Sequence, residues 1–207
     1  MSLFELTTHA ERGYSPRTRH NARVADLTAA FAFDFETRGE LLTHLCAGPS
    51  YVALPLTVPP IEAARQLFRA LRARNARVLN VAGNSLPTLL KHGVDQDAAN
   101  AYVFETISIV TRHWRLMRIV SGGQTGIDVA GGVAALALGI DAVLTFPPGF
   151  LQRAADGHDH THTEEEVLAS FAQMTRTLAD TFRTQDAPAP CAEVESHEHA
   201  EMACACA

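Results

Sequence analysis

The sequence predicts an α/β protein with a doubly wound, mostly parallel sheet of five strands, of the Rossmann-like type, with helices on both faces. Three observations support this prediction. Short apolar, β-prone runs alternate with helical segments, polar turns separate the two, and a glycine-rich turn joins the fourth run to a small-residue helix. The strands are expected at residues 24–33, 51–56, 77–82, 116–121 and 140–146.

Helical segments lie between these strands. Residues 39–46 are expected to form a short helix, Pro59 and Pro60 open the next one, and a third runs from about residue 95 to 113. The last helix begins at Thr163-Glu164-Glu165-Glu166, which has the form of a capping box. We expect residues 1–16 to be an N-terminal extension, residues 17–184 to form the domain, and residues 185–207 to be a disordered acidic tail with His and Cys residues.

The composition limits the class of protein. A chain of 207 residues with 47% hydrophobic content can bury one sizeable core. The formal charge of −6 argues against a nucleic-acid partner held by general electrostatics. No apolar stretch approaches the roughly 20 residues that span a bilayer, and the first residues do not resemble a signal peptide. We therefore expect a cytoplasmic protein without a membrane partner, and we expect it to form a homo-oligomer.

The most informative segment is MRIVSGGQTGIDVA, from Met117 to Ala130. Its glycines allow positive φ and the close approach of a ligand, and the free N–H groups of the following helix attract an anion. We therefore predict a phosphate site at Ser121, Gly122, Gly123, Gln124, Thr125, Gly126 and Asp128. The alternative is that the glycines only let strand and helix pack closely. If the phosphate prediction holds, Gly123→Val should abolish ligand binding and leave the thermal midpoint nearly unchanged.

Four polar turns follow predicted strands, at residues 34–43, 83–85, 121–128 and 147–159. In a parallel sheet these turns meet at one edge, where ligands bind at the point of strand-order reversal. Further ligand-binding residues are therefore predicted at Gly83, Asn84, Ser85, Thr37, Arg38, Gly39, Thr43, Pro148 and Gly149. Arg38 could neutralise a phosphate, although an exposed arginine without a ligand is equally consistent. In a competing arrangement the first 60 residues form a separate cap and only the glycine-rich turn contacts a ligand.

The sequences at these turns resemble a known family. SGGQTGID followed by ALALGI is similar to the opening of the molybdenum carrier proteins, the circularly permuted YpsA-type branch of the SLOG superfamily, which is related to the LOG phosphoribohydrolases. RTRHNARVADLTAAF resembles the family's middle segment, and VLNVAGNS resembles its last strand and turn. The resemblance implies a SLOG domain in a further permuted order, and it implies ligand-binding roles for Asn21 and Asp26. A doubly wound sheet tolerates permutation when its old termini are close.

Departures from the family pattern bear on the chemistry. Val129 and Val133 stand where the family has an arginine and a second aspartate, and the PGG-x-GT-x-x-E motif of the LOG hydrolases, with its glutamate, is absent. The first hypothesis is therefore a carrier or sensor of a phosphate-bearing small molecule, which the resemblance implies to be a molybdopterin-type cofactor or a nucleotide. The alternative is a hydrolase of a nucleotide-type ligand with Asp128, Asp26 or Glu40 as acid or base. A third possibility is an interaction protein that no longer binds a ligand.

Histidines and cysteines raise the question of a metal. His158, His160 and His162 alternate beside Asp159, a pattern that suits zinc, copper or nickel. We interpret this segment as a solvated loop and expect no stoichiometric transition metal. Cys46 lies alone in a helical segment, and the tail holds Cys191, Cys204 and Cys206 without the Cys-x-x-Cys spacing of a structural zinc site.

Overall fold

A six-stranded parallel sheet forms the centre of the protein in the computed structural model, which describes residues 3–185. The strand order is β1-β6-β5-β4-β2-β3, and all neighbouring strands run parallel. The strands are β1 (Phe4–Thr8), β2 (Leu27–Ala32), β3 (Tyr51–Pro55), β4 (Val78–Gly83), β5 (Arg118–Ser121) and β6 (Asp141–Phe146). The predicted α/β class and parallel sheet are confirmed, with one strand more than predicted.

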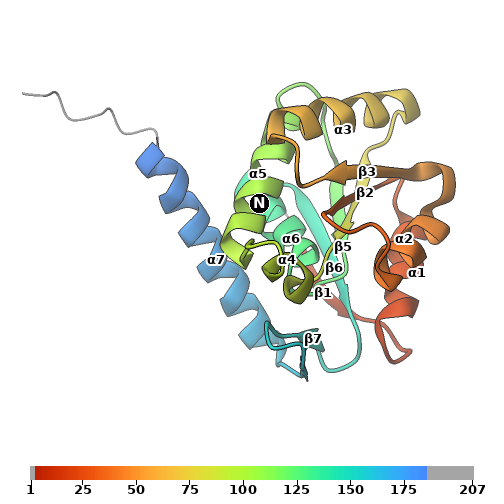
Figure 1. Cartoon of the computed structure of the whole chain (residues 1–207). Coiled ribbons are helices and arrows are strands. Elements are labelled where there is room, and N and C mark those ends of the chain that lie inside the picture. The colour runs from red at the N-terminus through yellow and green to blue at the C-terminus, as the bar shows by residue number, and fades with distance from the viewer. Residues whose placement is uncertain (1–2, 186–207) are drawn as a thin grey trace, which may run out of the picture.

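Helices cover both faces of this sheet (Figure 1). One face carries α1 (Tyr14–Val24) and α2 (Arg38–Ala47), which pack against each other; the other carries α3 (Pro60–Arg74), α5 (Gln96–Thr111), α6 (Ile127–Leu138) and α7 (Glu164–Gln185). The short helix α4 (Leu86–Leu90) and the 3₁₀ turn η1 (Gly48–Ser50) lie in connections. Because helices bury the sheet on both faces, a central strand such as β2 is buried along its whole length and is apolar except for Thr28.

The helix α6 lies unusually close to the sheet because it carries glycines where others carry side chains. A Cβ atom on Gly131 would lie 2.7 Å from the Cβ of Val81, and one on Gly132 would lie 2.7 Å from Leu144 Cδ2. The close packing brings the first turn of α6 directly against the carboxyl ends of β4 and β5.

The prediction that residues 1–16 form an extension outside the domain is wrong. Phe4 to Thr8 are β1, paired in register with Ala142 to Phe146 of β6, and the ring of Phe4 packs edge-on against Phe171 at 5.3 Å. The strand is only five residues long and contains a glutamate and two threonines, so its sequence shows no clear apolar pattern.

The helix α1 was also not predicted, for a different reason. Its buried residues are Arg17 and Asn21, one turn apart, so the helix has no apolar stripe. Polar residues on the buried face of a helix indicate that something other than core packing occupies that side.

The remaining elements agree with the sequence analysis to within a few residues. The capping box of α7 is confirmed, because Thr163 N donates to Glu166 Oε2 at 2.8 Å and Glu166 N donates to Thr163 Oγ1 at 3.2 Å. The turn at 147–159 holds a hairpin that was not predicted, of β7 (Gln152–Arg153) and β8 (Asp159–His160). The acidic tail, apart from residue 185, lies outside the described residues. Of the helices that the structure describes, none has the length and apolar character needed to cross a bilayer.

Candidate ligand-binding site

A cavity of about 550 Å³ opens at the carboxyl ends of β2 and β4. After β2 the chain passes through α2 to β3, whereas after β4 it passes through α4 and α5 to β5 on the opposite side. The two neighbouring strands are therefore followed by connections that leave in opposite directions, which is the point where open α/β sheets bind ligands. The volume lies in the range of about 300–1,000 Å³ that is usual for small-molecule sites.

Five segments that are far apart in the sequence line this cavity: α1, the start of α2, the end of β4 with the turn and α4 after it, the turn after β5 with the start of α6, and Arg153 of the hairpin. Predicted site residues among the lining residues are Asn21, Thr37, Arg38, Gly39, Thr43, Gly83, Asn84, Ser85, Gly122, Gln124 and Asp128. The competing arrangement, in which the first 60 residues form a separate cap, is wrong because β2 and β3 belong to the same sheet as β5.

A buried ion pair lies on the wall of the cavity. Arg17 Nη1 is 2.8 Å from Asp128 Oδ2, and the two side chains are 7% and 11% exposed. Burial raises the pKa of Asp128 above its ordinary value, and the guanidinium of Arg17 opposes this shift. Gly122 makes room for the pair, since a Cβ atom at this position would lie 1.3 Å from Arg17 Nη1.

Two buried polar atoms of α1 have no hydrogen-bond partner among the described residues. They are Arg17 Nε, a donor, and Asn21 Oδ1, an acceptor, on residues that are 6% and 3% exposed and that both line the cavity. An unpaired buried polar atom costs about 1–3 kcal/mol, so native proteins rarely leave one without a function. A ligand that offers an acceptor to Arg17 and a donor to Asn21 would satisfy both atoms.

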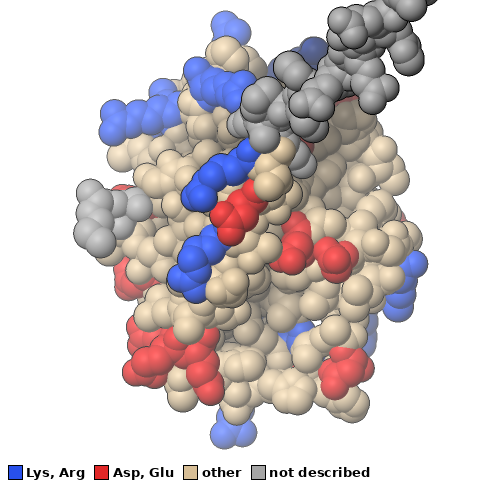
Figure 2. Space-filling view, turned by 90° about the vertical axis from the view of Figure 1, so that its left-hand side faces the viewer, with Lys and Arg blue, Asp and Glu red and all other residues tan. Residues whose placement is uncertain are grey.

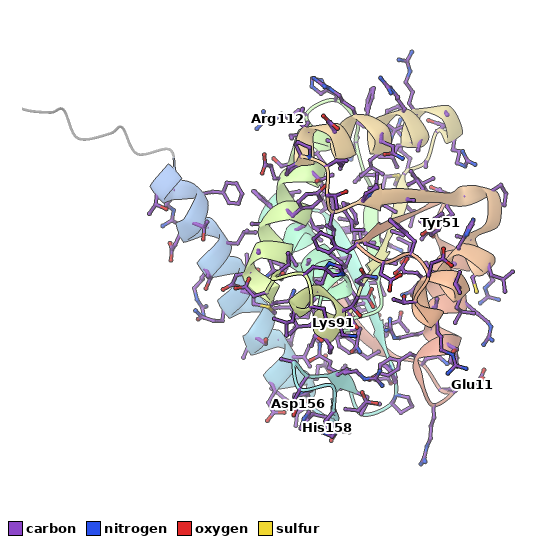
Figure 3. All side chains as sticks on the ribbon, in the orientation of Figure 1. Glu11, Tyr51, Lys91, Arg112, Asp156 and His158 are labelled. Atoms are coloured by element: carbon purple, nitrogen blue, oxygen red, sulfur yellow. The ribbon has the colours of Figure 1, made fainter. Side chains whose placement is uncertain are left out.

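Glu40 is a buried carboxyl group on another wall of the cavity. It belongs to the first turn of α2, where its backbone amide donates to the N-cap hydroxyl of Thr37 at 3.3 Å, and the residue is only 2% exposed. Burial raises the pKa of Glu40 to about 8, and the negative charge of Asp128 adds to the shift. Its hydrogen-bond donor is the hydroxyl of Tyr51 on β3, at 3.5 Å (Figure 3). Glu40 is therefore largely protonated at neutral pH, whereas Arg17 favours the ionised form of Asp128.

The hairpin of β7 and β8 closes one side of the cavity, where Arg153 is a lining residue. The hairpin is fixed to the glycine-rich turn: Arg153 N donates to Gln124 Oε1 at 2.8 Å, Gln152 Nε2 donates to the Gly123 carbonyl at 2.6 Å, and the Thr125 hydroxyl donates to the Arg153 carbonyl. It is also fixed to α1, because the Tyr14 hydroxyl donates to Asp159 Oδ1 at 2.8 Å. The predicted wall at residues 147–159 is thus formed by Arg153, and Pro148 and Gly149 do not line the cavity.

Several residues of the glycine-rich turn serve the fold instead of lining the cavity. Ser121 Oγ donates to the Val81 carbonyl at 2.7 Å and so links β5 to β4. The amide of Gly126 donates to Gln96 Oε1 at 2.7 Å, and the amides of Ile127 and Val129 donate to carbonyls of Asn84 and Gln124. The amides of Gly126, Ile127 and Val129 at the start of α6 therefore already donate within the protein. Ser121, Gly123, Thr125 and Gly126 are not among the lining residues.

The expected behaviour of Gly123→Val is wrong. Gly123 has a φ of +68°, and a Cβ atom would lie 2.3 Å from the ring of Phe146. Valine would therefore strain the backbone and displace a buried aromatic ring, so the substitution would lower the thermal midpoint.

Asp26 lies at the opposite edge of the sheet from the cavity. Its carboxylate accepts hydrogen bonds from the amides of Arg77 and Val78 at 2.8 Å each, at the start of β4. Asp26 follows α1 and precedes β2, so it sits where strands begin, whereas the cavity lies where they end. The ligand-binding role implied for Asp26 is therefore wrong.

The histidine segment lies at the outer end of the hairpin, where Figure 3 shows Asp156 and His158 at the periphery of the molecule. Among residues 3–185, no three His, Cys, Asp or Glu side chains are arranged to hold a metal ion. Cys46 is a free cysteine, and the tail cysteines lie outside the described residues. The expected absence of a transition metal stays a prediction.

The sequence analysis did not assign some lining residues to the binding site. They are Tyr14, Ser15, Arg17, Thr18, Glu40, Leu42, Asn80, Ala82, Thr88 and Arg153, of which Glu40 was named only as a possible acid or base. The available signal was the spacing of Arg17 and Asn21, which places two polar side chains on the same face of one helix.

We compared the chain with models of known protein families, with curated proteins and with solved structures, and none of the three comparisons gave a significant match.

Proposed function

We propose that the protein binds a phosphate-bearing small molecule, of the nucleotide or pterin-cofactor type, in the cavity between β2 and β4, and that it acts as a carrier or sensor. The proposal depends mainly on the two unpaired atoms in that cavity, Arg17 Nε and Asn21 Oδ1. A guanidinium N–H seeks an acceptor such as a phosphate or carbonyl oxygen, and an amide oxygen seeks a hydroxyl or N–H donor. Nucleotides and pterin cofactors carry both kinds of group.

The start of α2 is the part of the cavity that best suits an anion. The amides of Arg38 and Gly39 come before the first hydrogen bond within the helix, which Leu41 N donates to the Thr37 carbonyl. The positive end of the helix dipole also lies at this N-terminus. A Cβ atom on Gly39 would meet no atom within 4 Å, so a ligand can approach this backbone. The exposed guanidinium of Arg38 adds positive charge. The anion is therefore proposed at α2, because three amides at the start of α6 already donate within the protein.

We further propose that the chain is a permuted SLOG domain. The proposal is supported by the resemblance at residues 17–31, 78–85 and 121–128, and by the position of α1 and the turns after β4 and β5 around one cavity. A permuted order predicts such a meeting of distant segments.

The test measures binding of adenosine 5′-monophosphate, adenosine and inorganic phosphate by isothermal titration calorimetry. Arg38→Gln should weaken binding of the nucleotide by about 10- to 100-fold, the effect of one charged hydrogen bond, and should leave adenosine binding unchanged. Arg69→Gln is the control, because it removes the same charge from an exposed position on α3. Native mass spectrometry of the purified protein extends the test to co-purifying ligands. Unchanged nucleotide affinity in Arg38→Gln, or no binding of any phosphate compound, would contradict the proposal.

A second candidate function is hydrolysis of the bound ligand, and the buried Glu40 favours it. Glu40, which burial keeps largely protonated, and Asp128, which is paired with Arg17, place two carboxyl groups in different surroundings on one cavity, as acid and base catalysis requires. Incubation with adenosine 5′-monophosphate and chromatography of the products would detect hydrolysis. Glu40→Gln should then abolish product formation and retain binding; binding without any product in the wild type would favour the carrier.

A further inference from the structure

Arginines accumulate in two segments of the chain that lie outside the cavity. Between residues 63 and 94 and between residues 106 and 127 the sequence contains no Asp or Glu. Eight arginines, which we call the arginine patch, belong to these segments: Arg65, Arg69, Arg72, Arg74, Arg77, Arg112, Arg115 and Arg118. All except Arg77 are exposed.

The two segments form one surface because an aromatic cluster joins them. The ring of Phe68 on α3 contacts Trp114, in the turn after α5, at 6.3 Å. The guanidinium of Arg77 lies 4.1 Å from the centroid of the Trp114 ring and donates to the Arg115 carbonyl at 2.9 Å. The ring of His113, which follows Arg112, also contacts Phe68, at 6.4 Å. The arginines are thus held on a rigid part of the fold.

The positive charge of this surface is not neutralised within the described part of the chain. None of the eight arginines forms an ion pair with a carboxylate of residues 3–185. In Figure 2, the blue side chains gather in the upper part of the face, whereas the red ones lie mostly lower. Concentrated charge of one sign attracts a partner of the opposite sign.

The chain itself contains a segment of matching charge. Residues 186–207 include five acidic residues and no Lys or Arg: Asp186, Glu193, Glu195, Glu198 and Glu201. The whole chain has 17 basic and 23 acidic residues, so without these five acids the charge changes from −6 to −1. Most of the net negative charge therefore lies in the segment that follows α7.

The end of α7 places this segment within reach of the arginine patch. Phe182, near the end of α7, packs against Phe104 of α5 at 4.9 Å. Eight residues further along α5, or about 12 Å, the chain reaches Arg112. A segment of 22 residues spans up to about 70 Å when extended, and a short tether gives an effective concentration in the millimolar range, so weak ion pairs suffice. We propose that the acidic C-terminal segment docks on the arginine patch of the same chain.

Paramagnetic relaxation in the full-length protein tests the proposal. A nitroxide is attached to Cys204 after Cys46, Cys191 and Cys206 have been replaced by serine. The amide signals of residues 65–77 and 112–118 should broaden at 0.1 M salt. The broadening should disappear at 1 M salt, because the screening length falls from about 10 Å to about 3 Å.

Charge reversal identifies the contact. Arg112→Glu with Arg115→Glu should remove the broadening, and adding Glu195→Arg with Glu198→Arg should restore it. The control is Arg12→Glu with Arg19→Glu, which changes the charge equally at exposed positions in and before α1 and should have no effect.

Three results would overturn the proposal. The first is broadening at another surface, or none at 0.1 M salt. The second is broadening of the patch only in a mixture of nitroxide-labelled and isotope-labelled chains, which would place the segment on a neighbouring copy. The third is a combination of two observations: the nitroxide broadens no signal, and a single-stranded oligonucleotide at 0.15 M salt shifts the amide signals of the arginine patch. This result would mean that the patch binds a foreign polyanion.

Discussion

Gly122→Ala tests the geometry of the cavity wall. The added Cβ atom would lie 1.3 Å from Arg17 Nη1 and 2.3 Å from Asp128 Oδ2. The backbone of Gly122 does not have a positive φ, so alanine meets no backbone strain there and the effect comes from the two charged side chains. The guanidinium of Arg17 must therefore move, and because the pair is buried we expect this movement to separate Arg17 from Asp128.

The burial of the ion pair sets the size of the effect. The two side chains are 7% and 11% exposed, and breaking a buried ion pair costs about 3–5 kcal/mol. For a protein of this size, 1 kcal/mol corresponds to about 2–4 °C in the thermal midpoint. Gly122→Ala should therefore lower the midpoint by about 6–20 °C. Gly39→Ala is the matched control: it adds the same atom to open space in the first turn of α2 and should raise the stability by up to about 1 kcal/mol.

Urea unfolding followed by circular dichroism measures these differences. Arg17→Ala alone should be as damaging as Gly122→Ala, because it leaves Asp128 buried without its partner. The double variant should be little worse than either single variant, since the pair can be broken only once. A stability of Gly122→Ala within about 1 kcal/mol of the wild type, or additive effects in the double variant, would refute this reasoning.

Three further predictions concern protonation, the hairpin and metal content. Burial raises the pKa of Glu40 from its ordinary value of 4.5 to about 8. Between these two pH values the native state keeps a proton that the unfolded chain releases. The free energy of unfolding of the wild type should therefore fall by a few kcal/mol, relative to that of Glu40→Gln, as the pH rises from about 4.5 to 8. If the difference in unfolding free energy between the wild type and Glu40→Gln did not vary with pH, this pKa shift would be contradicted. Tyr14→Phe removes the hydrogen bond that the tyrosine hydroxyl donates to Asp159, and it should speed tryptic cleavage after Arg153. The control is Tyr102→Phe, which removes a hydrogen bond to the Val58 carbonyl and should not change the cleavage rate. Equal cleavage rates in the wild type and Tyr14→Phe would show that the hydroxyl does not hold the hairpin. Elemental analysis of untagged protein should find no stoichiometric zinc, nickel or copper; one equivalent that is lost when His158, His160 and His162 are replaced by alanine would overturn this expectation.

The sequence was sufficient to predict five of the six strands, because strands buried on both faces have mainly apolar sequences. It was also sufficient to predict that the turns after three strands meet, since parallel strands end at one edge. It was not sufficient for α1, whose buried side chains are Arg17 and Asn21. A helix that buries polar groups against a cavity resembles an exposed segment in its sequence, and the two can be distinguished only when the neighbouring segments are in place.

The chemistry of the site depends on contacts between distant residues. The raised pKa of Glu40 requires its burial in the folded chain and the charge of Asp128 from α6, and neither is visible in the local sequence. Asp26 shows the opposite case, because it is close to Asn21 in the chain but α1 runs from the cavity to the other edge of the sheet between them. Proximity in sequence was therefore a poor guide to proximity in the site.

The space that Gly122 leaves for the guanidinium of Arg17 also constrains how this protein can evolve. Neither position can change freely alone: a larger residue at 122 needs a smaller one at 17, and a chain without the arginine loses the need for the glycine. Among descendants of a common ancestor, the two positions should therefore change together. Such correlated substitution would reveal the wall of the cavity in an alignment, which a single sequence cannot do.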